Sequence, residues 1–213
     1  MQAHVHGSID AIDARQWNLL AGTEVPFLRH EFLAALEHTE CVGGATGWDP
    51  HYVVLEDRRG LAGAVPAFVK SHSYGEFVFD FGWAQAYARS GRNYYPKLTV
   101  AVPFTPATSA RLLVRPGLER AATARRLLEA VQASAAERQL SSVHALFLTD
   151  ADRLDFARAG WLSRRDCQFH WTNRGYGSFG DFLETFTAEK RKKTRREPIW
   201  RSEERRVGKE CRS

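Results

Sequence analysis

The longest helical pattern of the chain, residues 118–139, lies between two short apolar stretches, and this order constrains the fold more than any other feature. Leu128 and Val131 recur on one stripe, so one face of the helix is expected to be buried. The stretches 111–115 and 143–148 have the length and composition of strands. Strands that alternate with helices favour an α/β fold with a mixed sheet.

Shorter patterns extend this order in both directions. Asp13, followed three residues later by Gln16, is typical of a helix start, and the turn 57–60 is typical of a hairpin. The remaining patterns predict strands over 4–8, 52–55, 61–69, 98–102 and 162–172, and helices after 13 and 26 and over 83–89, 152–159 and 179–196.

Residues 70–106 combine dense aromatic residues with interleaved polar ones, which is the composition of a ligand cavity wall. Phe77, Phe79 and Phe81 alternate with Asp80, which predicts a strand with Asp80 on the opposite face. His72, Glu76 and Asp80 are therefore the candidate catalytic acids and bases. The alternative is a rim of polar residues that satisfies loop backbone groups.

A second set of polar and aromatic residues follows closely and is expected to bind substrate. An aromatic wall with a lysine suits an anionic or sugar-like ligand, although tyrosine pairs also pack at core edges with wet hydroxyls. The set comprises Tyr74, Trp83, Tyr94, Tyr95 and Lys97.

Several of these motifs also carry a family resemblance. The stretches 72–80, 94–98 and 102–106, together with 26–33 and 168–171, resemble the bacterial peptidoglycan biosynthesis/recognition proteins. That family is similar to the Fem-type aminoacyl transferases and belongs to the GNAT-type N-acyltransferase superfamily. The resemblance implies a GNAT-like domain over residues 1–175, a mixed sheet flanked by helices. It also implies transfer of an acyl or aminoacyl group to an amine acceptor in cell-envelope metabolism.

The resemblance leaves the acyl donor open between acyl-CoA and aminoacyl-tRNA, neither of them a bound prosthetic group. GNAT enzymes hold the coenzyme A pyrophosphate on a glycine-rich loop before the long helix. In this chain the loop, residues 115–123, keeps only Gly117, and Glu119 adds a negative charge. This departure disfavours acyl-CoA, and an ordinary strand–helix connection is the alternative reading.

The basic charge of the chain is concentrated near its end. Residues 190–213 hold 11 of the 30 Lys and Arg residues but only 4 of the 25 Asp and Glu residues, which leaves positions 1–189 with a net charge of −2. A solvated helix end and a phosphate-binding surface for tRNA both fit this run. The candidate phosphate contacts are Lys190, Arg191, Lys193 and Arg195.

The end of the chain is predicted to differ from the rest. Residues 176–200 are expected to form a basic helix that leads to a missing second half, without which the 213 residues would be inactive. Residues 201–211 resemble the translation of a common sequencing adapter, so the tail 201–213 is expected to be artefactual.

The remaining features bear on compartment and metal content. No apolar run approaches the roughly 20 residues of a membrane span, and no secretory signal pattern opens the chain. The cysteine spacing indicates neither a disulfide framework nor a zinc site, so the cytoplasm is the expected compartment and no metal is expected. Two rival functions stay open: a non-catalytic module that recognises peptidoglycan precursors, and a tRNA- or RNA-binding protein.

Overall fold

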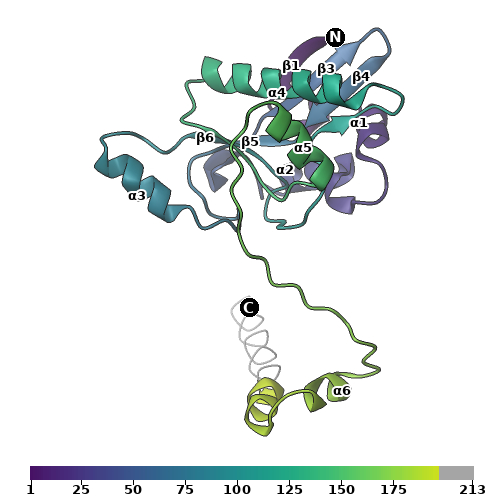
Figure 1. Ribbon diagram of the computed structural model, residues 1–213. Coiled ribbons are helices and arrows are strands. Elements are labelled where there is room, and N and C mark those ends of the chain that lie inside the picture. Colours follow the sequence, from purple (N-terminus) through teal and green to yellow (C-terminus); the bar gives the residue numbers. More distant parts are fainter. Residues whose placement is uncertain (197–213) are drawn as a thin grey trace, which may run out of the picture. The chain divides into compact units, whose positions relative to one another are not determined.

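A computed structural model describes residues 1–196 and divides the chain into two compact units (Figure 1). The first unit is Met1–Asp166 and the second begins at Cys167. The predicted tail, 201–213, lies outside the described residues, and the division into residues 1–175 and 176–200 stays a prediction. Among the described residues, no helix has both the length and the apolar character needed to cross a bilayer.

The first unit contains two four-stranded sheets. One has the order β1 (Gln2–His6), β3 (Tyr52–Asp57), β4 (Gly60–Val65) and β7 (Leu113–Val114), with antiparallel pairs throughout. The other has the order β2 (Trp48–Pro50), β5 (Ala67–Lys70), β6 (Lys97–Val100) and β8 (Val143–Ala145), and its β6–β8 pair is parallel. With the helices that flank these sheets, this arrangement confirms the predicted α/β class with a mixed sheet.

Five α-helices belong to the first unit (Figure 1). Side-chain caps start three of them: Asp13 accepts a hydrogen bond from Gln16 N, Glu119 from Ala121 N and Ala122 N, and Thr149 from Asp152 N. The helices are α1 (Ala14–Ala21), α2 (His30–His38), α3 (Phe81–Arg89), α4 (Arg120–Glu137) and α5 (Asp150–Arg158), with short 3-10 turns at Ile9–Ala11, Pro26–Leu28 and Gly44–Thr46.

The stretch 61–69, predicted as one strand, is divided between the two sheets. β4 ends at Val65 in one sheet, and β5 begins at Ala67 in the other. Pro66 stands between them, and proline has no N–H with which to continue a sheet ladder. The chain therefore passes from one sheet to the other at this residue.

Two hydrophobic clusters form the core of the first unit. In the first, the aromatic rings of Trp17, Tyr52 and Phe68 meet edge to face with centroids 5.6 Å apart. In the second, Leu128 and Val131 of α4 bury the predicted apolar stripe, and α4 packs across β3 and β4. The long helix thus covers the sheet as its sequence pattern predicts.

Two predicted strands are wrong. Residues 77–80 form no strand, because the backbone bonds locally, from Glu76 N to Ser73 O and from Asp80 N to Val78 O. Residues 162–172 also form no strand, and the side chains of Leu162 and Phe169 are 99% and 95% exposed. A strand needs a partner edge, and neither segment pairs with one within residues 1–196.

The second unit contains α6 (Phe179–Glu184) and a further helical segment over 188–196, so the helix predicted over 179–196 is broken at 185–187. Ser178 caps α6 by accepting a hydrogen bond from Asp181 N. The aromatic rings of the second unit pack on one another with centroids 4.8–6.4 Å apart. These rings belong to Trp171, Tyr176, Phe179, Phe182 and Phe186.

Candidate functional site

A buried lysine holds two carboxylates together inside the first unit. Lys97 Nζ lies 2.9 Å from Glu76 Oε2 and 2.6 Å from Asp80 Oδ2. It also donates to Ser73 Oγ over 3.2 Å. The side chain of Lys97 is fully buried, and those of both acids are nearly so. We call Ser73, Glu76, Asp80, Tyr94 and Lys97 the Lys97 cluster.

The strand register brings a second lysine to the same place. Lys70 on β5 is paired with Lys97 on β6, and both are fully buried. Like charges opposite each other on neighbouring strands destabilise a sheet unless other groups compensate them. Lys70 Nζ lies 3.8 Å from the centre of the Trp48 ring and donates to Tyr74 O over 3.2 Å. The acids of the Lys97 cluster compensate the two cations.

Two consecutive tyrosines close the cluster from the other side. Tyr94 donates its hydroxyl to Asp80 Oδ2 over 2.7 Å, and the hydroxyls of Tyr95 and Ser73 are 2.7 Å apart. Burial, and then the hydrogen bond to Asp80, raises the pKa of Tyr94. Tyr94 therefore stays a hydrogen-bond donor throughout the physiological pH range.

The two carboxylates have different proton affinities. Burial raises the pKa of Glu76 and outweighs the opposing effect of Lys97. Burial acts in the same direction on Asp80, but hydrogen bonds from Lys97, Ser73 and Tyr94 outweigh it and lower the pKa of Asp80. Paired titratable groups whose pKa values are pushed apart are typical of acid and base roles.

Each carboxylate also keeps one oxygen free of a protein partner. Glu76 Oε1 and Asp80 Oδ1 are buried and accept no hydrogen bond within the described residues. Thr99 Oγ1 on β6 is buried and unpartnered as well. Since buried polar atoms are nearly always hydrogen-bonded, these atoms are suited to contact water or a ligand.

The structure brings together five of the residues predicted from sequence: Glu76, Asp80, Tyr94, Tyr95 and Lys97. Three others lie outside the cluster. His72 is half-buried and accepts a hydrogen bond from Tyr74 N, while Tyr74 and Trp83 are exposed. Their predicted roles stay predictions.

The predicted phosphate contacts lie in the second unit and differ among themselves. Lys190, Lys193 and Arg195 are exposed. Arg191 is half-buried and donates to Phe186 O over 3.2 Å, so its guanidinium stabilises its own unit. Three of the four residues are thus available for a phosphate.

Sequence reasoning missed three members of the surroundings. Ser73 contacts Lys97, and Lys70 lies opposite it on the neighbouring strand. Burial lowers the pKa of His144 to about 4, and its ring meets Tyr94 edge to face. Lys70 and Lys97 each stand in a largely apolar strand pattern. Because an unpaired lysine is rarely buried, these two lysines could have indicated a buried cluster of charged groups.

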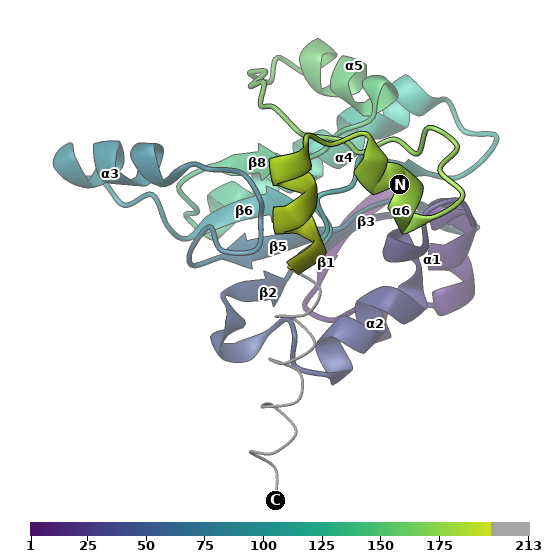
Figure 2. The same cartoon turned by 90° about the horizontal axis from the view of Figure 1, so that it is seen from below.

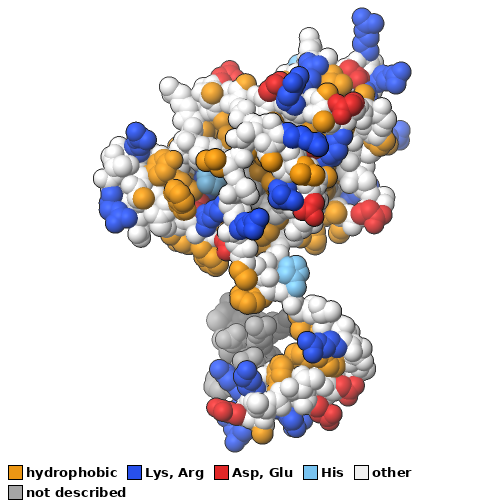
Figure 3. Space-filling view, viewed as in Figure 1, with side chains coloured by type: hydrophobic (Ala, Val, Ile, Leu, Met, Phe, Trp, Pro, Cys, Tyr) orange, Lys and Arg blue, Asp and Glu red, His pale blue; other side chains and the backbone are white. Residues whose placement is uncertain are grey.

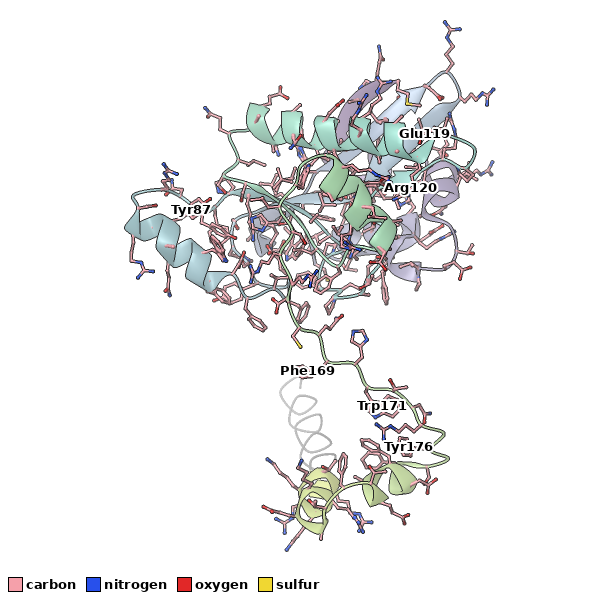
Figure 4. All side chains as sticks on the ribbon, viewed as in Figure 1. Tyr87, Glu119, Arg120, Phe169, Trp171 and Tyr176 are labelled. Atoms are coloured by element: carbon pink, nitrogen blue, oxygen red, sulfur yellow. The ribbon has the colours of Figure 1, made fainter. Side chains whose placement is uncertain are left out.

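The start of α4 is already occupied by side chains of the protein itself. Both carboxylate oxygens of Glu119 accept hydrogen bonds from the backbone N–H groups of Ala121 and Ala122. Figure 4 labels Glu119 and Arg120 at this end of the helix, and Arg120 forms ion pairs with Asp152 and Asp155 of α5. An open pocket of about 400 Å³ lies beside these residues and includes none of the Lys97 cluster.

Lys70 is expected to make the stability of the protein rise with pH. Burial lowers its pKa to about 8, whereas a lysine in an unfolded chain has a pKa of about 10.4. Between these values the unfolded chain holds a proton that the native state has lost, so unfolding becomes less favourable as pH rises. The expected gain is on the order of 3 kcal/mol across the window.

Urea unfolding at about pH 7.5 and about pH 10 checks this expectation. The gain should be present in the wild type, absent in Lys70→Met and unchanged in Lys190→Met, since Lys190 is exposed. A gain of equal size in Lys70→Met would assign the pH dependence to other groups.

The chain is similar to a known protein family and to a solved structure. A family described as peptidoglycan biosynthesis/recognition, FemAB-like, matches residues 8–209. A solved structure titled as a probable acetyltransferase is similar at 10% sequence identity with a TM-score of 0.45, over 83% of this chain and 99% of the other. A search of curated proteins gave no match.

Proposed function

The chain belongs to the FemAB-like family of peptidoglycan biosynthesis/recognition proteins, and on that premise we propose that it transfers an acyl or aminoacyl group to an amine acceptor. The acceptor is a peptidoglycan-related peptide or precursor, and the reaction takes place in the cytoplasm. The observation that carries the proposal is the Lys97 cluster, in which Glu76 and Asp80 share one buried cation.

In this proposal Glu76 is the group that moves the proton. A carboxylate with a raised pKa is closer to the working pH, where acid–base catalysis is most efficient. The amine nitrogen attacks the acyl carbon and gives its proton to Glu76 Oε1. The tetrahedral intermediate then expels the donor oxygen or sulfur, which takes that proton. The carboxylate is regenerated and one amide bond replaces one ester or thioester bond.

Asp80 and Lys97 position this chemistry. Asp80, with its lowered pKa, stays ionised and holds both Lys97 Nζ and the Tyr94 hydroxyl. The Lys97 ammonium lies beside Glu76 and supplies positive charge close to the oxygen that becomes negative during attack. His72 and Tyr74 lie in the same irregular segment and would contact the incoming acceptor.

Substrate access requires movement of the segment that carries Glu76. Residues 71–80 contain no helix or strand, and Gly75 has a positive φ of 80°. A Cβ at Gly75 would lie 2.6 Å from the ring of Phe104, so only glycine fits there without a shift. We propose that this segment opens at Gly75 when the acceptor binds.

A Glu76→Gln variant is expected to lose about 100-fold or more in turnover while staying folded. The assay uses the full-length gene product, a synthetic stem peptide with a free amine, and either labelled aminoacyl-tRNA or acyl-CoA. Mass spectrometry then detects the new amide. Glu24→Gln is the matched control, because Glu24 is exposed and lies outside the Lys97 cluster, so this variant should turn over as the wild type does.

Three results decide between this proposal and its rivals. Wild-type turnover in Glu76→Gln would exclude Glu76 as the proton carrier. Tight binding of the peptide without any product would favour a recognition module. Salt-dependent affinity for RNA that is lost when residues 190–196 are neutralised, again without product, would favour RNA binding through the exposed cations of the second unit.

A further inference from the structure

The loop and helix that follow Glu76 present an unusual exposed surface. Five aromatic side chains within ten residues are between 45% and 76% exposed: Tyr74, Phe77, Phe79, Phe81 and Trp83. We call these five residues the aromatic surface. Single exposed apolar residues are common, but soluble proteins rarely leave a contiguous group of large ones in water. A binding partner is the usual reason for such a group.

The fold itself holds these side chains outward. Glu76 and Asp80 are anchored inward by Lys97, and the residues between them alternate, so Phe77 and Phe79 point to solvent. Phe77 has a φ of 57°, a conformation that bulky residues rarely adopt. The buried ion pairs thus maintain a locally unfavourable backbone that exposes two phenylalanines.

Helix α3 extends this surface away from the sheets of the first unit. α3 has no buried residue, and it projects from the rest of that unit in two perpendicular views (Figures 1 and 2). Tyr87 is half-buried and packs edge to face on Tyr94, which connects the helix to the Lys97 cluster. In the space-filling view, hydrophobic side chains gather along α3, with basic side chains at its outer end (Figure 3).

The exposed charges of residues 74–95 are positive. Residues 74–95 contain two acids, Glu76 and Asp80, and both are buried. Its exposed ionised side chains are Arg89 and Arg92. In residues 74–95 the exposed aromatic rings are followed by exposed cations, a combination that matches the interface of an anionic lipid bilayer. Arg164, which donates to Phe79 O, adds positive charge beside this surface and pairs with the exposed Asp166.

We propose that the aromatic surface, together with Arg89 and Arg92, is a peripheral binding site for an anionic membrane. The phenylalanines would enter the boundary between headgroups and acyl chains, and the arginines would contact lipid phosphates. A nucleic acid fits less well, because its binding depends on many phosphate contacts and this region offers two cations. This proposal does not rest on the proposed transferase chemistry, although Tyr74 belongs to both sites, and the experiment measures binding to vesicles without any turnover.

Vesicle co-sedimentation of the 213-residue chain tests the proposal. The probes are vesicles of phosphatidylcholine alone and of phosphatidylcholine mixed with phosphatidylglycerol. Because the end of the chain has its own basic run, the assay is repeated with the Lys and Arg residues of 190–213 replaced by glutamine. The protein is expected to bind the mixed vesicles in this background as well.

Two sets of variants then separate the apolar and ionic contributions. Phe79→Ser with Phe81→Ser is expected to lower affinity for the mixed vesicles roughly tenfold or more. Arg89→Gln with Arg92→Gln is expected to remove the preference for phosphatidylglycerol. Leu19→Ser is the matched control, since Leu19 is 60% exposed on α1, and it should bind as the wild type does. Circular dichroism checks that each variant is folded.

Equal binding of the wild type and the phenylalanine variant would overturn the proposal. So would a failure of the wild type to bind either vesicle. If the same phenylalanine changes instead abolish binding to an RNA oligonucleotide, or a concentration-dependent dimer, then the aromatic surface belongs to that partner and not to a membrane.

Discussion

Replacing Lys97 with methionine is expected to destabilise the protein by about 3–5 kcal/mol. The substitution keeps the approximate length of the side chain but removes the ammonium that lies within 3 Å of both carboxylates. Glu76 and Asp80 would then be buried without a hydrogen-bonded cation, which is far costlier than losing an exposed ion pair. The midpoint of urea unfolding at neutral pH measures the loss.

A triple variant tests whether charge is the cause. Adding Glu76→Gln and Asp80→Asn to Lys97→Met removes the buried charges as well, so a large part of the lost stability should return. Lys190→Met is the control for the loss of an exposed lysine and should change stability by less than about 0.5 kcal/mol. Equal unfolding midpoints for Lys97→Met and the wild type would show that the carboxylates do not depend on Lys97.

Replacing Asp152 with alanine is expected to cost a similar amount, about 3–5 kcal/mol. Asp152 is fully buried near the start of α5. Its carboxylate accepts hydrogen bonds from the backbone N–H groups of Arg111 and Leu112 and pairs with Arg120 over 2.7 Å. The Arg111 guanidinium is itself fully buried, and Asp152 provides its opposing charge. Alanine would leave the buried Arg111 cation without an opposing carboxylate, although it keeps its hydrogen bonds to Ala107 O and Leu146 O, and would leave two backbone donors without an acceptor.

The same helix supplies a matched control. Asp150 is the first residue of α5, and its side chain is 94% exposed in a pair with Arg153. Asp150→Ala should therefore change the free energy of unfolding by less than about 1 kcal/mol. Thermal or urea unfolding of the two variants side by side gives the comparison. Equal losses would mean that burial of Asp152 has no special importance.

The sequence pattern predicted most elements of the fold because their signals were local. The capping residue Asp13, the hairpin turn at 57–60 and the apolar stripe of α4 each act within a few residues of their own position. The two wrong strands, 77–80 with its alternating phenylalanines and 162–172, pair with no neighbouring edge among the described residues. Pairing is decided by the rest of the fold, which alternation alone does not report.

The residues of the candidate site could be predicted from the sequence, but the contacts between them could not. The sequence drew attention to Glu76, Asp80 and Lys97 because ionisable groups are dense in an aromatic segment. That Lys97 pairs with both acids depends on the turn at residues 73–80 and on the β5–β6 register. Neither is encoded in spacing along the chain, so Lys70 was missed as the partner across the strands.

If the proposed transfer reaction takes place, the side chains at the start of α4 influence which acyl donor the protein accepts. Glu119 is tethered one residue before the helix, so its carboxylate competes for the N–H groups of Ala121 and Ala122 as an intramolecular ligand. Tethered ligands of this kind act at effective concentrations of roughly millimolar or above. A donor diphosphate would have to displace that carboxylate and overcome its charge. The Glu119 carboxylate would then disfavour donors that carry a diphosphate relative to donors that do not.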